Sequence, residues 1–443
     1  MRLRGVFATL VLIAGITANG YSQAVSSLRG TVTDPSGAIL PGASVVLVSD
    51  ERGFKESNVT DANGNYVFPQ VPPGTYNLQV SASHFAPYQA RVTLLVQQPA
   101  NLNIKLKVNA ISEQVEVTDQ APVLNTTDAS IGDAVNNATI QELPIEGRNV
   151  PDLLSLQPGV LYLGRKVDPV ADSRSGSVSG ARSDQSNVTL DGVDDNDQLQ
   201  GLAFTGVLRA TMDSVQEFRV TTTGENADSG RSSGGQVTLV TKSGTNKLHG
   251  SLYEYNRNTY FAANDWFNKA SEIGAGQPNK PGQLIRNTFG ASLGGPIRKD
   301  KVFFFLNYEG QRTAENQQLI QPVPSSTLRQ GIVQYVAKDG STVTLQPSDL
   351  KAMDPNCFAL GNCPWGGGVD PNVIPVLQGY PLPNLPGSGD GLNIEDFTFS
   401  ARNPVSLNTY IAKLDFQLSS ANQLFARGTS RSSAKILEST RAR

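Results

Sequence analysis

A strict alternation of polar and apolar residues near the C-terminal end constrains the fold of this chain more than any other feature. From Thr409 to Leu418 the even-numbered residues are apolar, and the odd-numbered ones are polar apart from Ile411. Side chains of a β-strand point alternately to the two faces of a sheet, so this strand has one apolar and one polar face. Phe289, Ala291 and Leu293 repeat the pattern between polar or small neighbours. The region therefore predicts strands that lie between apolar and polar surroundings.

The spacing of these strands indicates how they are connected. The expected strands are Lys247–Asn256, Leu284–Gly295, Lys301–Arg312, Leu407–Leu418 and Asn422–Arg431. Long links (257–283 and 313–406) alternate with short ones (296–300 and 419–421), as in transmembrane barrels with long extracellular loops and short periplasmic turns. So few strands cannot close a barrel, and open edges would leave unpaired backbone groups in lipid. We therefore expect an incomplete transmembrane β-barrel in residues 247–443, and a chain that is the N-terminal fragment of a longer receptor or a truncated product.

Three glycine-punctuated phrases precede the long strands: SGSVSGARSDQSNVTLDGVDDND, VQEFRV and GRSSGGQVTLVTKSGTN. Each combines a short strand with a turn, and Asp191-Gly192 is one such turn. The phrases predict a small α/β unit. Its polar face is dense in Arg, Asp and Glu, and a domain surrounded by water does not need so many charges. A domain enclosed by a polar tube does need them, because the buried polar groups of the tube wall require charged or hydrogen-bonding partners.

These phrases resemble the plug domain of TonB-dependent outer-membrane receptors of the Oar-like branch. The resemblance implies a plug over residues 121–246, a location in the cell outer membrane, contact with membrane lipid, and TonB as a periplasmic partner. It also implies an extracellular ligand, which in this family is an iron chelate, a vitamin or an oligosaccharide. An outer-membrane adhesion or assembly protein built from the same parts, without transport, is the alternative function.

The plug is expected to be held by polar contacts with the barrel. The residues expected to make them are Arg148, Arg182, Asp191, Asp194, Asp195, Glu217, Arg219 and Arg231. For Arg148 we expect a barrel carboxylate as the partner. The acidic cluster that extends to Asp197 could also bind calcium, but it lacks the spacing of an EF-hand. Hydrogen bonding between plug and barrel is therefore the favoured role of these acids.

The N-terminal part begins with an export signal. Arg2 and Arg4 precede an apolar run from Val6 to Ile16, and small residues then lead to Ala24. This pattern predicts a secretory signal peptide over residues 1–24, cleaved after Ala24. The apolar run is shorter than the roughly 20 residues that a membrane-spanning helix needs.

Residues 25–108 show short strands separated by turns, which is the pattern of a β-sandwich. The phrases GTVTD, LPGA and GNY resemble the carboxypeptidase regulatory-like domain, a transthyretin-like sandwich of the carbohydrate-binding-like fold group. The resemblance makes a carbohydrate one candidate ligand. Tyr66 and Tyr76 are expected in the core of this sandwich, which leaves few aromatic residues for its surface.

A polar hinge over residues 109–120 follows the sandwich. Its sequence EQVEVT resembles the TonB box, a segment that pairs with TonB by strand addition. The residues concerned are Glu113, Gln114, Val115, Glu116, Val117 and Thr118. Such a segment must be extended, exposed and poor in internal partners. An ordinary linker strand is the other interpretation of the same residues.

Composition excludes several other functions. A net charge of −3 and the absence of a polybasic stretch argue against nucleic acid as a partner. His84 and His249 are isolated in the sequence, and neither a nucleophile elbow nor a phosphate loop is present, so we expect no enzyme, no cofactor and no metal site. Cys357 and Cys363 are the two cysteines. A local disulfide is expected, with free thiols or a metal site as alternatives.

Overall fold

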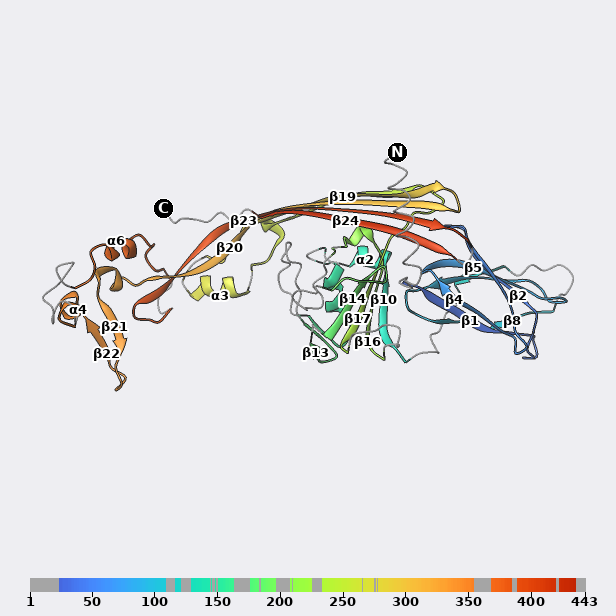
Figure 1. Ribbon diagram of the computed structural model, residues 1–443, viewed down its shortest axis with the longest axis horizontal. Helices are drawn as coiled ribbons and strands as arrows, with labels where there is room; N and C mark the ends of the chain where they lie inside the picture. Colours follow the sequence, from blue (N-terminus) through green and yellow to red (C-terminus); the bar gives the residue numbers. More distant parts are fainter. Residues whose placement is uncertain are drawn as a thin grey trace, which may run out of the picture. The chain divides into compact units, whose positions relative to one another are not determined.

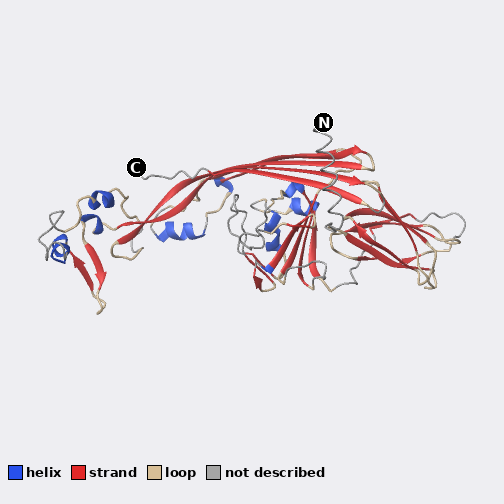
Figure 2. Ribbon diagram, viewed as in Figure 1, coloured by secondary structure: helices blue, strands red, loops and turns tan. Residues whose placement is uncertain are grey.

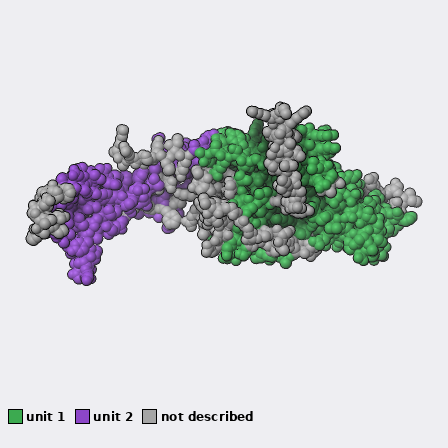
Figure 3. Space-filling model, in the orientation of Figure 1, with its two compact units in different colours: residues 1–254, 289–310, 407–433 green, residues 255–288, 311–406, 434–443 purple. Residues whose placement is uncertain are grey.

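The computed structural model describes residues 24–108, 116–120, 129–143, 145, 148, 150–162, 176–182, 185–196, 208, 210–224, 233–264, 266–274, 276, 278–353, 368–384, 389–419 and 422–435. The chain divides into two compact units, which Figure 3 colours separately. The first contains residues 1–254, 289–310 and 407–433, and the second contains residues 255–288, 311–406 and 434–443. Strands dominate the described residues (Figure 2), so the predicted fold class, mainly β, is confirmed.

The first domain of unit 1 consists of two sheets that share one apolar core (Figure 1). One sheet contains β4 (Asn65–Val71), β1 (Ser26–Thr33), β7 (Ala100–Asn101) and β8 (Ile104–Lys105). The other has the order β3 (Phe54–Val59), β2 (Ser44–Ser49), β5 (Gly74–Ser81), β6 (Tyr88–Leu94) and β9 (Glu116–Gln120). Leu28, Leu47, Phe68 and Leu78 are fully buried between the sheets. Tyr66 and Tyr76 are buried with them, as predicted.

The plug sequence folds as a five-stranded sheet that is covered by short helices. The sheet has the order β10 (Ile131–Asn136), β16 (Val215–Thr223), β17 (Gly235–Thr241), β14 (Ser186–Leu190) and β15 (Val193–Asp194). The smaller elements are α2 (Asn137–Glu142), η1 (Val150–Leu156), η3 (Met212–Ser214), β11 (Val160–Tyr162), β12 (Gly176–Val178) and β13 (Ala181–Arg182). Ile140 of α2 and Leu153 and Leu154 of η1 pack on the sheet through Phe218 and its neighbours.

A tight turn determines where the acidic end of β14 lies. Asp191 and Gly192 both adopt left-handed backbone conformations, with φ of 52° and 80°. Asp tolerates this conformation better than most residues, and Gly adopts it freely. The turn therefore directs the chain back into β15, as the Asp-Gly pair predicts, and leaves the Asp191 carboxylate at the end of the sheet.

The long strands form a third sheet, and all five expected strands are present. The sheet has the order β18 (His249–Asn258), β19 (Leu284–Arg298), β20 (Val302–Pro324), β23 (Ile394–Gln417) and β24 (Gln423–Lys435). The strands β20 and β23 are much longer than predicted. Along β23, Thr409, Ile411 and Lys413 are buried, whereas Tyr410 and Leu414 are exposed. The even-numbered face is thus apolar and exposed, as the alternation predicts, and the exceptional Ile411 lies buried on the opposite face.

The second unit contains the elements of the long links. They are α3 (Trp266–Gly274), the hairpin of β21 (Val333–Val336) and β22 (Thr342–Leu345), α4 (Pro347–Met353), α6 (Val373–Gln378), η4 (Thr259–Phe261) and η5 (Leu328–Gln330). Arg329 joins η5 to the segment after α6 by donating hydrogen bonds to the carbonyls of Gln378 and Pro381. Cys357 and Cys363 lie outside the described residues, so the expected disulfide stays a prediction.

Among the helices in the described ranges, none combines the length and the apolar character that crossing a bilayer requires.

Candidate functional site: the charged contacts of the plug sheet

The first charged contact of the plug sheet is centred on Asp191. Its carboxylate accepts hydrogen bonds from the backbone N–H of Thr241 at 2.8 Å and from the Thr241 hydroxyl at 2.7 Å. It also pairs with Arg427 Nε at 2.8 Å and Lys413 Nζ at 3.4 Å. The two cations come from β23 and β24, and all three charged side chains are at most 8% exposed. Asp191 therefore connects the plug sheet to the long strands.

The surroundings of the two cations complete this contact. Lys413 Nζ also donates to the Thr241 carbonyl at 3.3 Å and lies 5.3 Å from the centre of the Phe425 ring. Arg427 donates to the Leu190 carbonyl at 3.4 Å. A buried carboxylate is tolerated only when it is paired and hydrogen-bonded. Removing one member of such a cluster leaves an uncompensated buried charge, which is strongly destabilising.

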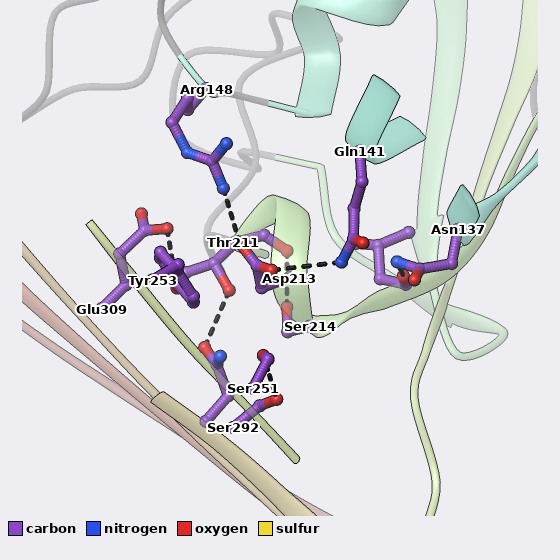
Figure 4. A network of polar contacts seen from close by, with 12 residues as sticks. Asn137, Gln141, Arg148, Thr211, Asp213, Ser214, Ser251, Tyr253, Ser292 and Glu309 are labelled. Carbon is purple, nitrogen blue, oxygen red and sulfur yellow. Dashed lines mark hydrogen bonds and ion pairs between the residues drawn. The ribbon is translucent and has the colours of Figure 1, made fainter. Parts of the chain in front are cut away.

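The second contact joins Arg148 to Asp213 and is drawn in Figure 4. Arg148 Nη2 lies 2.5 Å from Asp213 Oδ2, and Gln141 donates to the other carboxylate oxygen at 3.1 Å. The Arg148 guanidinium also lies 5.4 Å from the centre of the Tyr253 ring in β18. Arg148 therefore has a partner within the plug, the buried Asp213 of η3. The barrel contributes the Tyr253 ring, and the expected pairing of Arg148 with a barrel carboxylate stays a prediction.

Burial determines the electrostatics of this second contact. Burial raises the pKa of the Asp213 carboxyl, and the positive charges of Arg148 and Lys242 oppose that rise. Burial likewise lowers the pKa of Lys242, and Asp213 opposes that shift. Each group thus makes the charged form of its neighbour more stable. Arg148 is the member of this cluster that lies against the Tyr253 ring, so the cluster depends on the barrel for part of its environment.

Two further hydrogen bonds lie at the contact between plug and barrel. Thr211 in the plug donates to the side-chain oxygen of Asn307 in β20 at 2.8 Å. On the barrel strands, Tyr253 donates to Glu309 at 3.1 Å, as Figure 4 shows. Asn307 and Glu309 are both nearly inaccessible to solvent. The odd-numbered face of β20 thus presents Asn307 and Glu309 next to the buried Phe303 and Phe305.

The third contact joins the plug to the N-terminal sandwich through Glu217 and Arg219. Glu217 Oε1 accepts a hydrogen bond from the Val96 N–H at 2.8 Å, and Arg219 Nη1 donates to the Val96 carbonyl at 3.2 Å. Beside them, Thr238 donates to the side-chain oxygen of Gln97 at 2.7 Å. The partner that the structure shows for Glu217 and Arg219 is thus the loop after β6, and their expected contact with the barrel stays a prediction.

The pKa of the Glu217 carboxyl is higher than that of an ordinary glutamate. Burial raises its pKa to about 7, although the Val96 N–H and the charge of Arg219 both act in the opposite direction. Desolvation disfavours the charged form, and here it outweighs the two favourable neighbours. The group consequently titrates in the neutral range while it lies at the junction of two domains.

The remaining predicted plug residues have other positions. Asp194 accepts a hydrogen bond from the Asn196 N–H, and Asp195 accepts one from the Leu208 N–H at 2.9 Å, both within the plug. The described part of the chain contains no group of three His, Cys, Asp or Glu residues placed to hold a metal ion. The side chain of Arg182, and the whole of Asp197 and Arg231, lie outside the described residues.

The expected TonB box is partly described. Its second half, Glu116 to Thr118, belongs to β9, which pairs in parallel with β6 so that Glu116 lies opposite Gln89 and Gln120 opposite Arg91. The segment is extended, as expected, but it has a sheet partner, contrary to the expectation of few internal contacts. Residues 113–115 lie outside the described residues.

Two family models match the chain. One, described as an outer membrane beta barrel domain, matches residues 240–440, and one described as a carboxypeptidase regulatory-like domain matches residues 27–107. The chain thus carries a regulatory-like sandwich followed by an outer-membrane barrel region, and its location is the outer membrane. It is 29% identical over 320 residues to the TonB-dependent transporter Oar of Myxococcus xanthus. The match covers 70% of this chain and 28% of the relative. The predicted resemblance to Oar-like TonB-dependent receptors is confirmed.

Two solved structures are similar to a small part of the chain. Catechol 1,2-dioxygenase of Acinetobacter radioresistens shares 16% identity over 22% of this chain and 57% of its own, with a TM-score of 0.18. The 3-chlorocatechol 1,2-dioxygenase of Rhodococcus opacus shares 11% identity over 20% of this chain and 62% of its own, also with a TM-score of 0.18. Likeness at this level carries no argument about fold or function.

Three charged residues of these contacts were not predicted from the sequence. Lys413 and Arg427 are the barrel partners of Asp191, and Asp213 is the plug partner of Arg148. The position of Lys413 on the polar face of an alternating strand is a signal that could have identified it, because a charge on an inward face needs a counter-charge. Asp213 lies in a three-residue helical turn, where no periodicity indicates which side is buried.

Proposed function

We propose that this chain acts in an outer-membrane receptor that binds an extracellular ligand and imports it with energy delivered through TonB. The main observation in favour is the seating of the plug sheet on the long strands by discrete buried charges, above all Asp191 with Lys413 and Arg427. An apolar interface would resist sliding over its whole area. A few polar contacts hold a plug in place and yet can be broken one after another. The similarity to a TonB-dependent transporter supports the same proposal.

We further propose that Glu113–Thr118 is the segment on which TonB pulls. It lies between the sandwich and the plug, and its second half is already extended in β9. A segment of this kind binds by adding a strand to the sheet of its partner, with backbone hydrogen bonds as the main source of affinity. Among the described strands β9 is last in its sheet and pairs with β6 along one edge, so its other edge is where a TonB strand could be added.

A carbohydrate is the ligand class that we propose to test first, because the sandwich resembles carbohydrate-binding-like folds. The sandwich itself offers little aromatic surface, since the Tyr66 and Tyr76 hydroxyls donate inward to the carbonyls of Leu102 and Pro72. Exposed aromatic residues occur instead in the link after β18, where Tyr260 and Phe261 are 89% and 84% exposed. Aromatic rings with one open face suit contact with sugar rings.

The decisive experiment replaces Val117 by proline. Proline has no backbone N–H and cannot complete a strand ladder. We expect Val117→Pro to weaken binding of the purified C-terminal domain of TonB at least about tenfold, which corresponds to roughly 1.4 kcal/mol. Val117→Thr is the matched control, because it keeps the backbone N–H and a high strand propensity. Equal TonB binding by wild type and Val117→Pro would contradict the proposal.

A further inference from the structure

The N-terminal sandwich contacts both the plug and the barrel strands, through two separate loops. The loop after β6 presents Val96 and Gln97 to the plug strands β16 and β17. The turn between β2 and β3, residues 50–53, contacts the connection before β18 and the turn between β19 and β20. When the plug leaves its seat, one of these two contacts must open.

The contact with the plug is buried and charged. Val96 is fully buried, and Glu217 and Arg219, which hold its N–H and carbonyl, are 3% and 4% exposed. Hydrogen bonds to charged groups are among the stronger ones in proteins, and leaving such a group buried without its partner adds a desolvation cost. This contact therefore resists opening.

Arg219 also connects this contact to the start of the plug. Its Nη2 donates to the Ser130 hydroxyl at 3.3 Å, while its Nη1 donates to the Val96 carbonyl. Ser130 immediately precedes β10, the first plug strand after the proposed TonB segment. A force that reaches Ser130 from that segment thus acts on a side chain that already holds the sandwich.

The side-chain hydrogen bonds of the contact with the barrel side are exposed, and Arg52 of the same turn lies within electrostatic reach of Asp415 in β23. The Asn246 N–H donates to the Glu51 carbonyl at 2.7 Å, and the Asn246 side chain donates to the Asp50 carbonyl at 3.3 Å and to Asp300 at 2.6 Å. Both side-chain bonds are solvent-exposed, where water replaces a lost partner at little cost. This contact opens more easily than the one at Val96.

Gly53 shows how closely the sandwich approaches the barrel turn. Its φ is +63°, and a Cβ added there would lie 2.6 Å from the Cα of Asp300. The backbones of the two turns are therefore in direct contact, and any larger residue must push them apart.

We infer that the sandwich and the plug move as one body when the plug is displaced, and that the contact of residues 50–53 with Asn246 and Asp300 is the one that opens. The inference rests on the proposed function, because it concerns displacement by a pull on the segment before β10. The sandwich then acts as a retaining element, which holds the resting plug against the barrel turn and leaves together with it.

Hydrogen exchange of two backbone amides tests this order of opening. The Val96 amide donates to Glu217 and reports on the plug contact, and the Asn246 amide donates to Glu51 and reports on the barrel contact. We would measure both in the purified receptor in phosphatidylethanolamine vesicles, at increasing sub-denaturing urea. We expect the Asn246 amide to exchange at least about tenfold faster and to lose protection first. Loss of protection at Val96 before or together with Asn246 would overturn the inference.

Substitutions separate the two contacts. Gly53→Ala should speed exchange at Asn246 and leave Val96 unchanged, whereas Arg219→Gln should speed exchange at Val96. Gly37→Ala is the matched control, because Gly37 also has a positive φ, of +93°, and no atom lies within 4 Å of its added Cβ. An equal effect of Gly53→Ala and Gly37→Ala on Asn246 would also overturn the inference.

Binding of the TonB C-terminal domain, measured on the same wild-type preparation, tests the proposed function separately. Binding together with early loss of protection at Val96 contradicts only the inference about joint movement. Absence of binding contradicts the proposed function, whereas the exchange order still decides whether sandwich and plug form one body.

Discussion

The N-terminal sandwich and the plug sheet are both β-structures of similar strand length, but they bury different kinds of residue. In β2 buried and half-buried positions alternate, and the buried apolar ones, Val45 and Leu47, belong to a core that the sandwich forms by itself. In β17 all seven residues are buried, including Gln236, Thr238 and Thr241. The sandwich is thus self-contained, whereas the plug sheet depends on neighbouring parts of the chain to match its polar side chains.

This difference has a consequence for stability. Apolar burial is non-directional and roughly proportional to area, so a core such as that of the sandwich tolerates changes outside it. Buried polar groups need particular partners at particular distances, and losing one leaves the other unsatisfied. A substitution in the sandwich core should therefore destabilise the sandwich alone. A substitution at the plug surface should also destabilise the contacts with the barrel strands or with the sandwich loop.

The largest effect is expected in the sandwich core. Replacing the fully buried Phe68 by alanine in residues 25–108, expressed alone, should lower the free energy of unfolding by about 3–5 kcal/mol. Urea denaturation followed by circular dichroism measures it. Val67→Ala is the control, because Val67 is 48% exposed and should change stability by less than about 0.5 kcal/mol. If the wild-type segment unfolded without a cooperative transition, the sandwich would not be self-contained, and the stated difference between sandwich and plug sheet would be wrong.

The next effect concerns the charged contact between plug and barrel. Asp191→Asn keeps the shape and tolerates the left-handed backbone, but leaves Lys413 and Arg427 buried without their acid. We expect a loss of about 3 kcal/mol in receptor stability, measured as a lower thermal midpoint in detergent. Asp194→Asn, at an exposed position of the same turn region, should have little effect. Equal midpoints for the two variants would show that the plug does not depend on this cluster.

The pH dependence of Glu217 sharpens the comparison at the junction of the two domains. The pKa of Glu217 is about 7 when sandwich and plug are in contact, against 4.5 for an ordinary glutamate carboxyl. Glu217 therefore binds its proton more strongly when sandwich and plug are in contact than when they are apart. The stability of the contact is thus highest below pH 4.5, falls as the pH rises to about 7, and is constant above that pH. One pKa unit corresponds to about 1.4 kcal/mol, so the total change is about 3 kcal/mol.

Glu217→Gln tests that dependence. Glutamine keeps the oxygen that accepts from Val96 but does not titrate, so exchange protection at Val96 should be similar in variant and wild type at low pH and higher in the variant above pH 7. Comparing the two proteins at each pH removes the intrinsic pH dependence of exchange. A constant ratio between pH 4 and 9 would show that this carboxyl does not titrate on separation of the domains.

The smallest effect is expected at Thr238, whose hydroxyl donates to Gln97 at the same junction. Thr238→Val removes one neutral hydrogen bond and should weaken the contact by about 1 kcal/mol, seen as faster exchange at Val96. Thr238→Ser retains the hydroxyl and is the control. If the serine variant weakened the contact as much as the valine variant, the methyl group would contribute as much as the hydroxyl, and the polar description of this face would be incomplete.

Much of the architecture follows from the sequence alone. The alternation around Tyr410 and Leu414 predicts the exposed apolar face of the long strands, because side chains on a strand must alternate between its faces. The Asp191-Gly192 pair predicts a tight turn, since few other residues accept a left-handed backbone. Each of these features depends on residues close together in the chain, and local geometry therefore determines it.

The partners of the charged residues were decided only by the tertiary structure. The sequence indicates that Glu217 and Arg219 lie on the polar face of a strand, but which surface covers that face depends on the packing of a loop more than 100 positions earlier, at Val96. Arg148 likewise pairs with Asp213, a partner within the plug that the sequence did not predict. Periodicity determines the direction in which a side chain points. The group that it meets depends on contacts between distant segments, because charge pairing acts over a few ångströms in space regardless of separation along the chain.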